Sequence, residues 1–230
     1  VLVLIEKYQT TNYYTTLTTD VTNVFETLNI ADSVIFVTDL KGFPEPVGNV
    51  IDIPPSYSYR IVGHVDLKGN RLNMLGNVTI LGESSETSSL YSTGLPTGQS
   101  LITSKFTFPS QRITYGCPEG CFVFNLEGDG TNGIDIQNVN FGSTVLPCGN
   151  IGTVSNYSNF IAFNCASLNV LGSGFVFNGS FGTIGFNQCF WNNEIGGTHL
   201  TFGSTLVILR RIRIIYSSMI TLIGKIGILY

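Results

Sequence analysis

The sequence is poor in charged residues. Asp, Glu, Lys and Arg make up 11% of the chain, less than half of the ~25% that is usual for soluble domains. The 15 acidic and 11 basic side chains give a net charge of −4. Because this composition offers no basic footprint for phosphates, we expect no nucleic-acid partner.

Strong helix formers are also scarce. Alanine is rare and Glu and Lys are few, whereas the chain has 26 Gly, 16 Phe and 10 Tyr. Thr, Ser and Asn are abundant as well. Aromatic and β-branched residues favour strands, and Gly and Asn favour tight turns. The composition therefore predicts an all-β chain, and 230 residues are enough to bury a sizeable core.

The motifs of common enzymes and cofactor proteins are missing. The chain has no Walker motif, no Rossmann fingerprint, no HExxH and no nucleophile elbow. Its two histidines, His64 and His199, lie far apart, and neither is set in a motif typical of a Ser-His-Asp triad. We therefore expect no cofactor and favour a protein that is not an enzyme.

No apolar run is long enough for a membrane-spanning helix. The opening VLVLIEK is too short for a signal peptide. The apolar C-terminal region is interrupted by Arg210, Arg211, Arg213 and Lys225. The longest uncharged run of this C-terminal region, 214–224, is about half of the ~20 residues needed to cross a bilayer. We expect no membrane span.

The cysteines are odd in number. They are Cys117, Cys121, Cys148, Cys165 and Cys189, so they cannot all pair within one chain. The CPEGC segment at 117–121 has the spacing of a metal knuckle, but a zinc site would need further ligands from distant segments. We expect no metal, and we interpret Cys165 and Cys189 as small core residues at inward strand positions.

One strand pattern recurs several times in the middle of the chain. GIDIQNVNF at 133–141, FIAFNC at 160–165 and TIGFNQCFW at 183–191 all alternate large apolar with small or polar residues. Alternation with period 2 indicates strands with one buried face. Short, similar strands that recur every ~20–30 residues are typical of a coil that stacks on itself. The sequence predicts a parallel β-helix of about six to seven coils.

The N-terminal region has a different character. Residues 8–22 are rich in Thr and Tyr, a short helix is expected around 21–30, and a strand at 33–40. Four prolines then punctuate residues 41–60. A β-helix needs a cap over its first coil, because an open edge invites aggregation. We therefore divide the chain into an N-terminal extension, cap or attachment region, 1–58, and a β-helix, 59–230.

Three carboxylates are the candidates for chemistry. Polysaccharide depolymerases built on β-helices use paired carboxylates, and Glu127, Asp129 and Asp135 are the nearest approach to such a pair here. Glu127 and Asp129 share a face only if the strand continues past them, and EGDGTNG is typical of a turn. Asp135 lies between Ile134 and Ile136 on the solvent side of its strand. We assign no catalytic residue.

Asparagine recurs in the strands, and two interpretations are open. The residues are Asn125, Asn138, Asn140, Asn164, Asn178 and Asn187. They could stack as amide ladders along the coil. They could instead occupy left-handed positions at corners, which Asn tolerates.

Several segments, taken in order along the chain, carry a resemblance to known proteins. They are FPEPVGNVIDIPPSYSYRIVGHVDLKGNRL (43–72), TILGESSETSSLYSTGL (79–95), LITSKFTFP (101–109), IGTVSNYSNFIAFNCASLN (151–169), FVFNGSFGTIGFNQCFW (175–191) and RRIRIIYSS (210–218). Together they resemble a group of bacteriophage structural proteins that is common in aquatic tailed phages. The similarity covers roughly residues 40–220 and contains no catalytic motif.

The resemblance implies a right-handed β-helix in a virion component, on the tail or the capsid surface, assembled as a homotrimer. We expect a non-enzymatic spike or fibre that contacts the host surface, with host polysaccharide and other virion proteins as partners. One alternative is a capsid decoration or head-fibre protein that binds its virion neighbours. The other is a β-helical polysaccharide depolymerase.

Overall fold

The computed structural model describes residues 33–191, 198, 200–202, 207–212, 220–222 and 226–227. From Val34 onward, these residues belong to one compact unit. The segment before residue 33, with the helix expected around 21–30, lies outside the described residues, as does His199. Expectations about them stay predictions.

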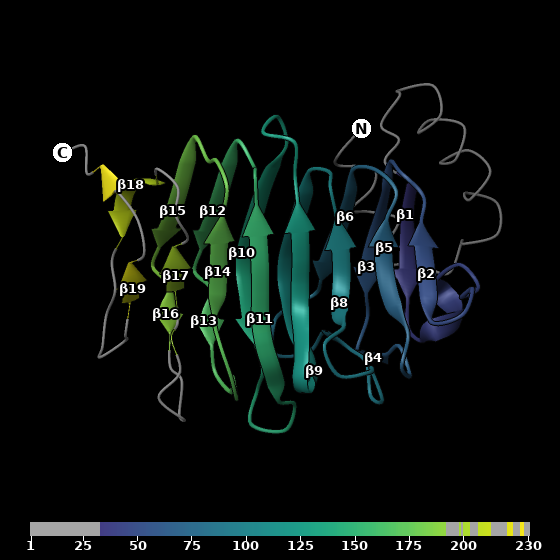
Figure 1. The fold of residues 1–230 in the computed structure, drawn as a ribbon. Helices are drawn as coiled ribbons and strands as arrows, with labels where there is room; N and C mark the ends of the chain where they lie inside the picture. The colour runs from purple at the N-terminus through teal and green to yellow at the C-terminus, as the bar shows by residue number, and fades with distance from the viewer. Residues whose placement is uncertain are drawn as a thin grey trace, which may run out of the picture. The chain divides into compact units, whose positions relative to one another are not determined.

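The described chain is a parallel β-helix, in which strands of successive coils stack side by side (Figure 1). Each full coil contributes one strand to each of three stacks. The first stack holds β1 (Ser33–Val37), β3 (Tyr57–Ile61), β6 (Val78–Gly82), the starts of β9 (Phe108–Glu127) and β10 (Gly133–Phe141), β12 (Asn159–Phe163), β15 (Thr183–Asn187), β18 (Val207–Ile212) and β20 (Ile226–Gly227).

The other two stacks complete each coil. The second holds β4 (His64–Asp66), β7 (Ser89–Tyr91), the middle of β9, the end of β10, β13 (Ala166–Ser167) and β16 (Phe190–Trp191). The third holds β2 (Val50–Ile53), β5 (Arg71–Met74), β8 (Ser100–Ser104), the end of β9, β11 (Cys148–Ser155), β14 (Phe175–Asn178), β17 (Leu200–Phe202) and β19 (Ile220–Leu222).

The predicted fold class is confirmed. About six turns of coil are formed, and among the described residues the helical content is one 3-10 turn, η1 (Leu40–Gly42). Strand pairs along all three stacks are parallel. The long β9 runs through all three stacks, because its 20 residues make up nearly a whole coil.

The core is a set of inward columns produced by the period-2 alternation. Ile134 pairs in register with Phe160 of the next coil, and Phe160 pairs with Ile184 of the coil after that. All three are fully buried, whereas Asp135 between the inward residues of β10 is half-buried. Stacking identical faces in this way places apolar side chains on apolar side chains in every coil, which stabilises the coil by removing them from water.

The coil starts earlier than the expected boundary at residue 59. β2 stacks in register on β5, with Ile51 beside Leu72 and Ile53 beside Met74. Ile51 and Ile53 are fully buried in the same core as the later coils. The prolines at 44, 46, 54 and 55 flank β2 without entering it, and so its ladder of backbone hydrogen bonds stays intact.

A left-handed residue turns the chain between the first and second stacks in four consecutive coils. Arg112, Asn138, Asn164 and Gln188 occupy equivalent positions with φ of 55, 53, 50 and 56°. The side chain of Asn164 donates a hydrogen bond through Nδ2 to Oδ1 of Asn138 at 2.6 Å. Both interpretations of the asparagines therefore hold for this pair, which forms a corner and a short amide ladder.

Candidate functional site

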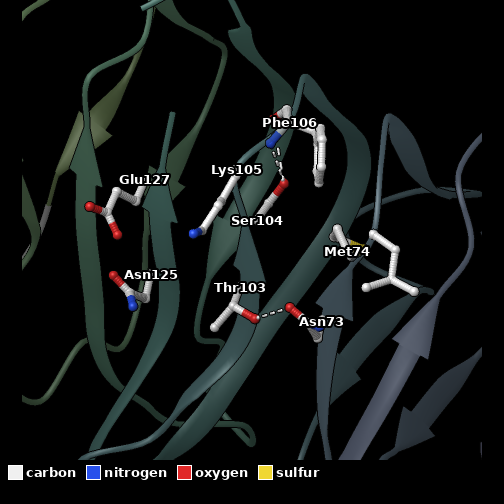
Figure 2. A pocket seen from close by; sticks show the side chains of 9 residues that line it. Asn73, Met74, Thr103, Ser104, Lys105, Phe106, Asn125 and Glu127 are labelled. Atoms are coloured by element: carbon white, nitrogen blue, oxygen red, sulfur yellow. Dashed lines mark hydrogen bonds between the residues drawn. The ribbon is translucent and has the colours of Figure 1, made fainter. Parts of the chain in front are cut away.

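A hollow in the described part of the chain lies on the outer side of the third stack. We call it the third-stack groove; its volume is about 260 Å³. β5, β8 and the end of β9 carry it across three successive coils (Figure 2). Its lining residues are Asn73, Met74, Leu75, Thr103, Ser104, Lys105, Phe106, Asn125 and Glu127.

One column of the groove is made of neutral polar side chains. Asn73 is in register with Thr103, and Thr103 with Asn125. Thr103 donates from Oγ1 to Oδ1 of Asn73 at 3.0 Å, and Asn73 donates from Nδ2 to Oδ1 of Asp52 at 2.8 Å. Coils are spaced by ~4.8 Å, so this column presents amides and a hydroxyl at regular intervals along the helix axis.

A second column lies just beyond the strand ends. Ser104 is in register with Leu126, so Lys105 follows β8 at the level where Glu127 ends β9. Both charged side chains are exposed on the hollow shown in Figure 2. The backbone N–H of Phe106 donates to Oγ of Ser104 at 3.1 Å, which holds the turn after β8 in place. The groove thus combines one cation, one anion, neutral donors and acceptors, and apolar Leu75 and Phe106.

The three candidate carboxylates do not come together in one site. Glu127 lines the third-stack groove. Asp129 lies in the turn after β9, where it accepts hydrogen bonds from the hydroxyl and backbone N–H of Thr131 at 2.6 and 2.9 Å. Asp135 is in the first stack and accepts from Nε2 of Gln137 at 3.1 and 3.2 Å. Asp129 and Asp135 do not line the groove, so neither of the other two candidate carboxylates accompanies Glu127 there.

Asp129 acts as a turn residue. The Thr131 hydroxyl, followed by the Thr131 backbone N–H, holds the pKa of Asp129 below its ordinary value, because both donate to the ionised form. A general acid needs the opposite change, a raised pKa. Gly128 and Gly130 flank Asp129 in this turn, and Gly130 has a φ of 90°. The interpretation of EGDGTNG as a turn is confirmed.

His64 forms a pair that the sequence did not predict. Its Nδ1 is 2.9 Å from Oγ of Ser89, one coil further on. Ser89 is 4% exposed, and the nearby Asp66 is engaged with Thr93 and with the backbone N–H of Lys68. A Ser-His pair without an orienting carboxylate or an open nucleophile does not make a hydrolase site.

The cysteines and histidines of the described chain do not gather into a metal site. No cluster of three or more His, Cys, Asp or Glu side chains suited to an ion occurs among these residues. All five cysteines are buried free thiols. Cys165 and Cys189 lie in the core at 1% and 3% exposure, as the alternation predicted.

Comparison of the chain with protein families, curated proteins and solved structures finds no match. Within the part of the chain that the structure describes, no helix has the length and apolar character to cross a bilayer.

Most of the groove was missed at the level of sequence. The sequence singled out Asn125 as a ladder or corner residue and Glu127 as a candidate carboxylate, and neither as part of a groove. It did not single out Asn73, Thr103 or Lys105. The usable signal is that polar residues sit at the outward positions of three successive third-stack strands. That signal becomes visible once the register between β5, β8 and β9 is known.

Proposed function

We propose that the chain is a non-enzymatic structural protein of a bacteriophage virion, a homotrimeric β-helical spike or fibre that contacts the host surface. The phage identity and the trimer rest on the resemblance of the ordered segments between residues 43 and 218. The β-helix described above is compatible with this origin. It is not specific to it, because one fold serves many functions.

One observation carries the non-enzymatic part of the proposal. The third-stack groove contains a single carboxylate, Glu127, with neutral amides and hydroxyls around it. Hydrolysis of a glycosidic bond generally needs two carboxyl groups within ~5–10 Å on either side of that bond. A groove with one carboxylate and several neutral hydrogen-bonding groups is suited to holding a ligand without cleaving it.

The ligand class that fits the groove is an extended glycan. Sugar hydroxyls pair with amides and hydroxyls such as those of Asn73, Thr103 and Asn125, and apolar sugar faces pack on residues such as Phe106. Because the polar column repeats at each coil, a chain running along the helix axis meets equivalent groups in succession. Lys105 and Glu127 add sites for a charged substituent.

Binding is tested on the full chain with polysaccharide extracted from the host bacterium, by calorimetry. The variant Asn73→Ala/Thr103→Ala/Asn125→Ala should lose binding at least tenfold. The matched control is Thr79→Ala/Asn187→Ala, which changes outward polar residues of the first stack, away from the groove, and should bind normally. Equal affinity of both variants would show that the groove is not the contact site.

The same preparation separates the alternatives. Shortening of the polysaccharide that is lost in Glu127→Gln would establish a depolymerase in place of a binding protein. Labelling the protein on intact particles distinguishes a tail position from a capsid position, and a capsid position supports the decoration protein. Mass measurement in solution tests the trimer, which a stable monomer at micromolar concentration contradicts.

A further inference from the structure

Four of the five cysteines are stacked in two pairs across neighbouring coils. Cys117 of β9 is in register with Cys148 of β11. Cys165 and Cys189 are equivalent in the next two coils, because the residues on either side of them, Phe163 with Asn187 and Ala166 with Phe190, pair in register. Adjacent parallel strands lie ~4.8 Å apart, which falls inside the Cα separation of ~4.4–6.8 Å that a disulfide requires.

The sulfur atoms of each pair share their surroundings. The thiols of Cys117 and Cys148 both approach the carbonyl oxygen of Asn150, at 3.8 and 3.5 Å. The sulfur of Cys165 lies 3.4 Å from the carbonyl oxygens of both Ile136 and Phe163. The thiol of Cys189 repeats this arrangement one coil further on, with Ala162 and Asn187 at 3.5 Å. The two thiols of each pair also interact with one another by a side-chain hydrogen bond in the coil interior.

The backbone at both pairs has room to adjust. The register between β9 and β11 shifts between Cys148 and Asn150. Cys165 lies between β12 and β13, and Cys189 lies between β15 and β16, so neither is held inside a regular strand. Small movements can thus bring the Cβ atoms to the ~3.8 Å that disulfides prefer.

We propose that Cys117–Cys148 and Cys165–Cys189 are oxidation sites, where a small-molecule disulfide converts each pair into a cross-link between successive coils. A thiolate of the pair attacks the small disulfide, forms a mixed disulfide and expels one small thiolate. The second cysteine, as its thiolate, attacks the protein sulfur and expels the other. Two protein S–H groups are oxidised, one S–S bond forms, and the reagent is reduced to two thiols.

The two thiols of each pair differ in the direction of their pKa shift. Cys117 and Cys189 have a lowered pKa, first because the partner thiol donates a hydrogen bond to them. Cys148 has a raised pKa because it is fully desolvated. Cys165 has a raised pKa because of its side-chain hydrogen bond with Cys189 and, after that, its burial. Thiolates are the reactive species, and in each pair the hydrogen bond between the two thiols favours ionisation of the one that accepts it. Because all four are buried, the reagent enters during local opening of the coil.

Cys121 is the odd cysteine. Its thiol donates to the carbonyl oxygens of Leu95 and Pro96 at 3.3 Å in the preceding coil. No cysteine faces it in register, because Phe122 beside it pairs with Ser100 and Asn150. The odd count is thus explained by two pairs and one thiol that stays reduced.

Thiol counting on the full chain tests the proposal. The native protein is incubated with oxidised glutathione, then denatured, alkylated and weighed by mass spectrometry. We expect a fall from five alkylated thiols to one, with cross-linked peptides that join Cys117 to Cys148 and Cys165 to Cys189. The urea midpoint of unfolding should rise on oxidation and return to its starting value with dithiothreitol.

Variants make the assignment specific. Cys148→Ala should leave two alkylated thiols after oxidation, Cys117 and Cys121, and Cys121→Ala, the matched control, should leave none. If the unaltered protein still has five alkylated thiols after incubation with oxidised glutathione, the proposal is overturned. A cross-link that contains Cys121 would overturn it as well. If Cys148→Ala does not fold, the peptide map of the unaltered chain decides by itself.

Discussion

The early and late coils of the β-helix are filled with different side chains. Between β2 and β8 the interior is mainly aliphatic, with buried Ile51, Leu72, Ile80 and Leu90. From β9 to β17 it is aromatic. The buried rings there are Phe108, Tyr115, Phe124, Phe141, Tyr157, Phe160, Phe175, Phe177, Phe181, Phe186, Trp191 and Phe202.

The two regions also differ in regularity. In the aromatic coils the left-handed corner recurs at Asn138, Asn164 and Gln188. In the aliphatic coils the corner is Gly63 in one coil, and long loops separate β6, β7 and β8. The third-stack groove lies where the irregular coils meet β9. The regular aromatic coils therefore form the uniformly packed part of the β-helix, and the irregular coils leave space on the outer surface for a ligand.

The largest effect is expected inside the aromatic coils. The ring of Phe175 lies 5.1–6.4 Å from the rings of six other aromatic residues. Phe175→Ala should lower the free energy of unfolding by ~3–5 kcal/mol, because it removes this packing and leaves a cavity. Urea unfolding measures the loss. Val176→Ala, the outward neighbour in β14, is the control and should lose less than ~1 kcal/mol; equal losses would contradict the inward assignment.

A smaller effect is expected at the left-handed corner. Asn138 has a φ of 53° and accepts the hydrogen bond from Asn164. Asn138→Ala should lower the free energy of unfolding by ~1–2 kcal/mol, because a Cβ without a local hydrogen bond disfavours this conformation. Asn138→Gly loses the same hydrogen bond but accepts the conformation, as Gly63 does at the corresponding corner. If the alanine variant is as stable as the glycine variant, the corner is not under backbone constraint.

The buried hydroxyl of Tyr115 should make the stability of the fold depend on pH in the alkaline range. Burial raises the pKa of Tyr115 above its ordinary value of 10.0, although the hydrogen bond with Ser110 opposes the shift. Above pH ~10 the unfolded chain loses this proton while the folded chain keeps it, so stability falls as pH rises. Tyr115→Phe should make the decline between pH 10 and 12 shallower by up to ~1.4 kcal/mol per pH unit. Unfolding midpoints at several pH values give the slope; unchanged slopes would exclude Tyr115 as its source.

The sequence predicted the aromatic coils well for a physical reason. Alternating Ile, Phe and Val at 133–141 and 183–191 have to face inward, whatever the register, because each strand has one buried face. The same pattern placed Cys165 and Cys189 in the core. The start of the coil was harder to place, because β2 is only four residues long and is enclosed by prolines.

The groove could not be predicted to the same degree. Its members come from three strands, and which of them are neighbours depends on the loop lengths between β5, β8 and β9. Glu127 and Asp129 share a face only in a continuous strand, and the strand ends at Glu127 because Gly128 begins a turn. Alternation shows that a residue points outward, but it does not show which residue lies beside it in the next coil.

The smallest effect on stability is expected in the outward polar column. Thr103→Val removes a hydrogen bond to Asn73, but the Asn73 amide oxygen left behind is hydrated at the surface, and valine is a good strand residue. The free energy of unfolding should change by less than ~0.5 kcal/mol. The matched inner change is Ser110→Ala, which leaves the buried Tyr115 hydroxyl without its 2.6 Å partner and should cost ~1–3 kcal/mol. Urea midpoints of the two variants compare the removal of a hydroxyl group outside and inside the coil. A larger loss for Thr103→Val would mean that the outward column supports the coil, and the groove would then be part of the scaffold.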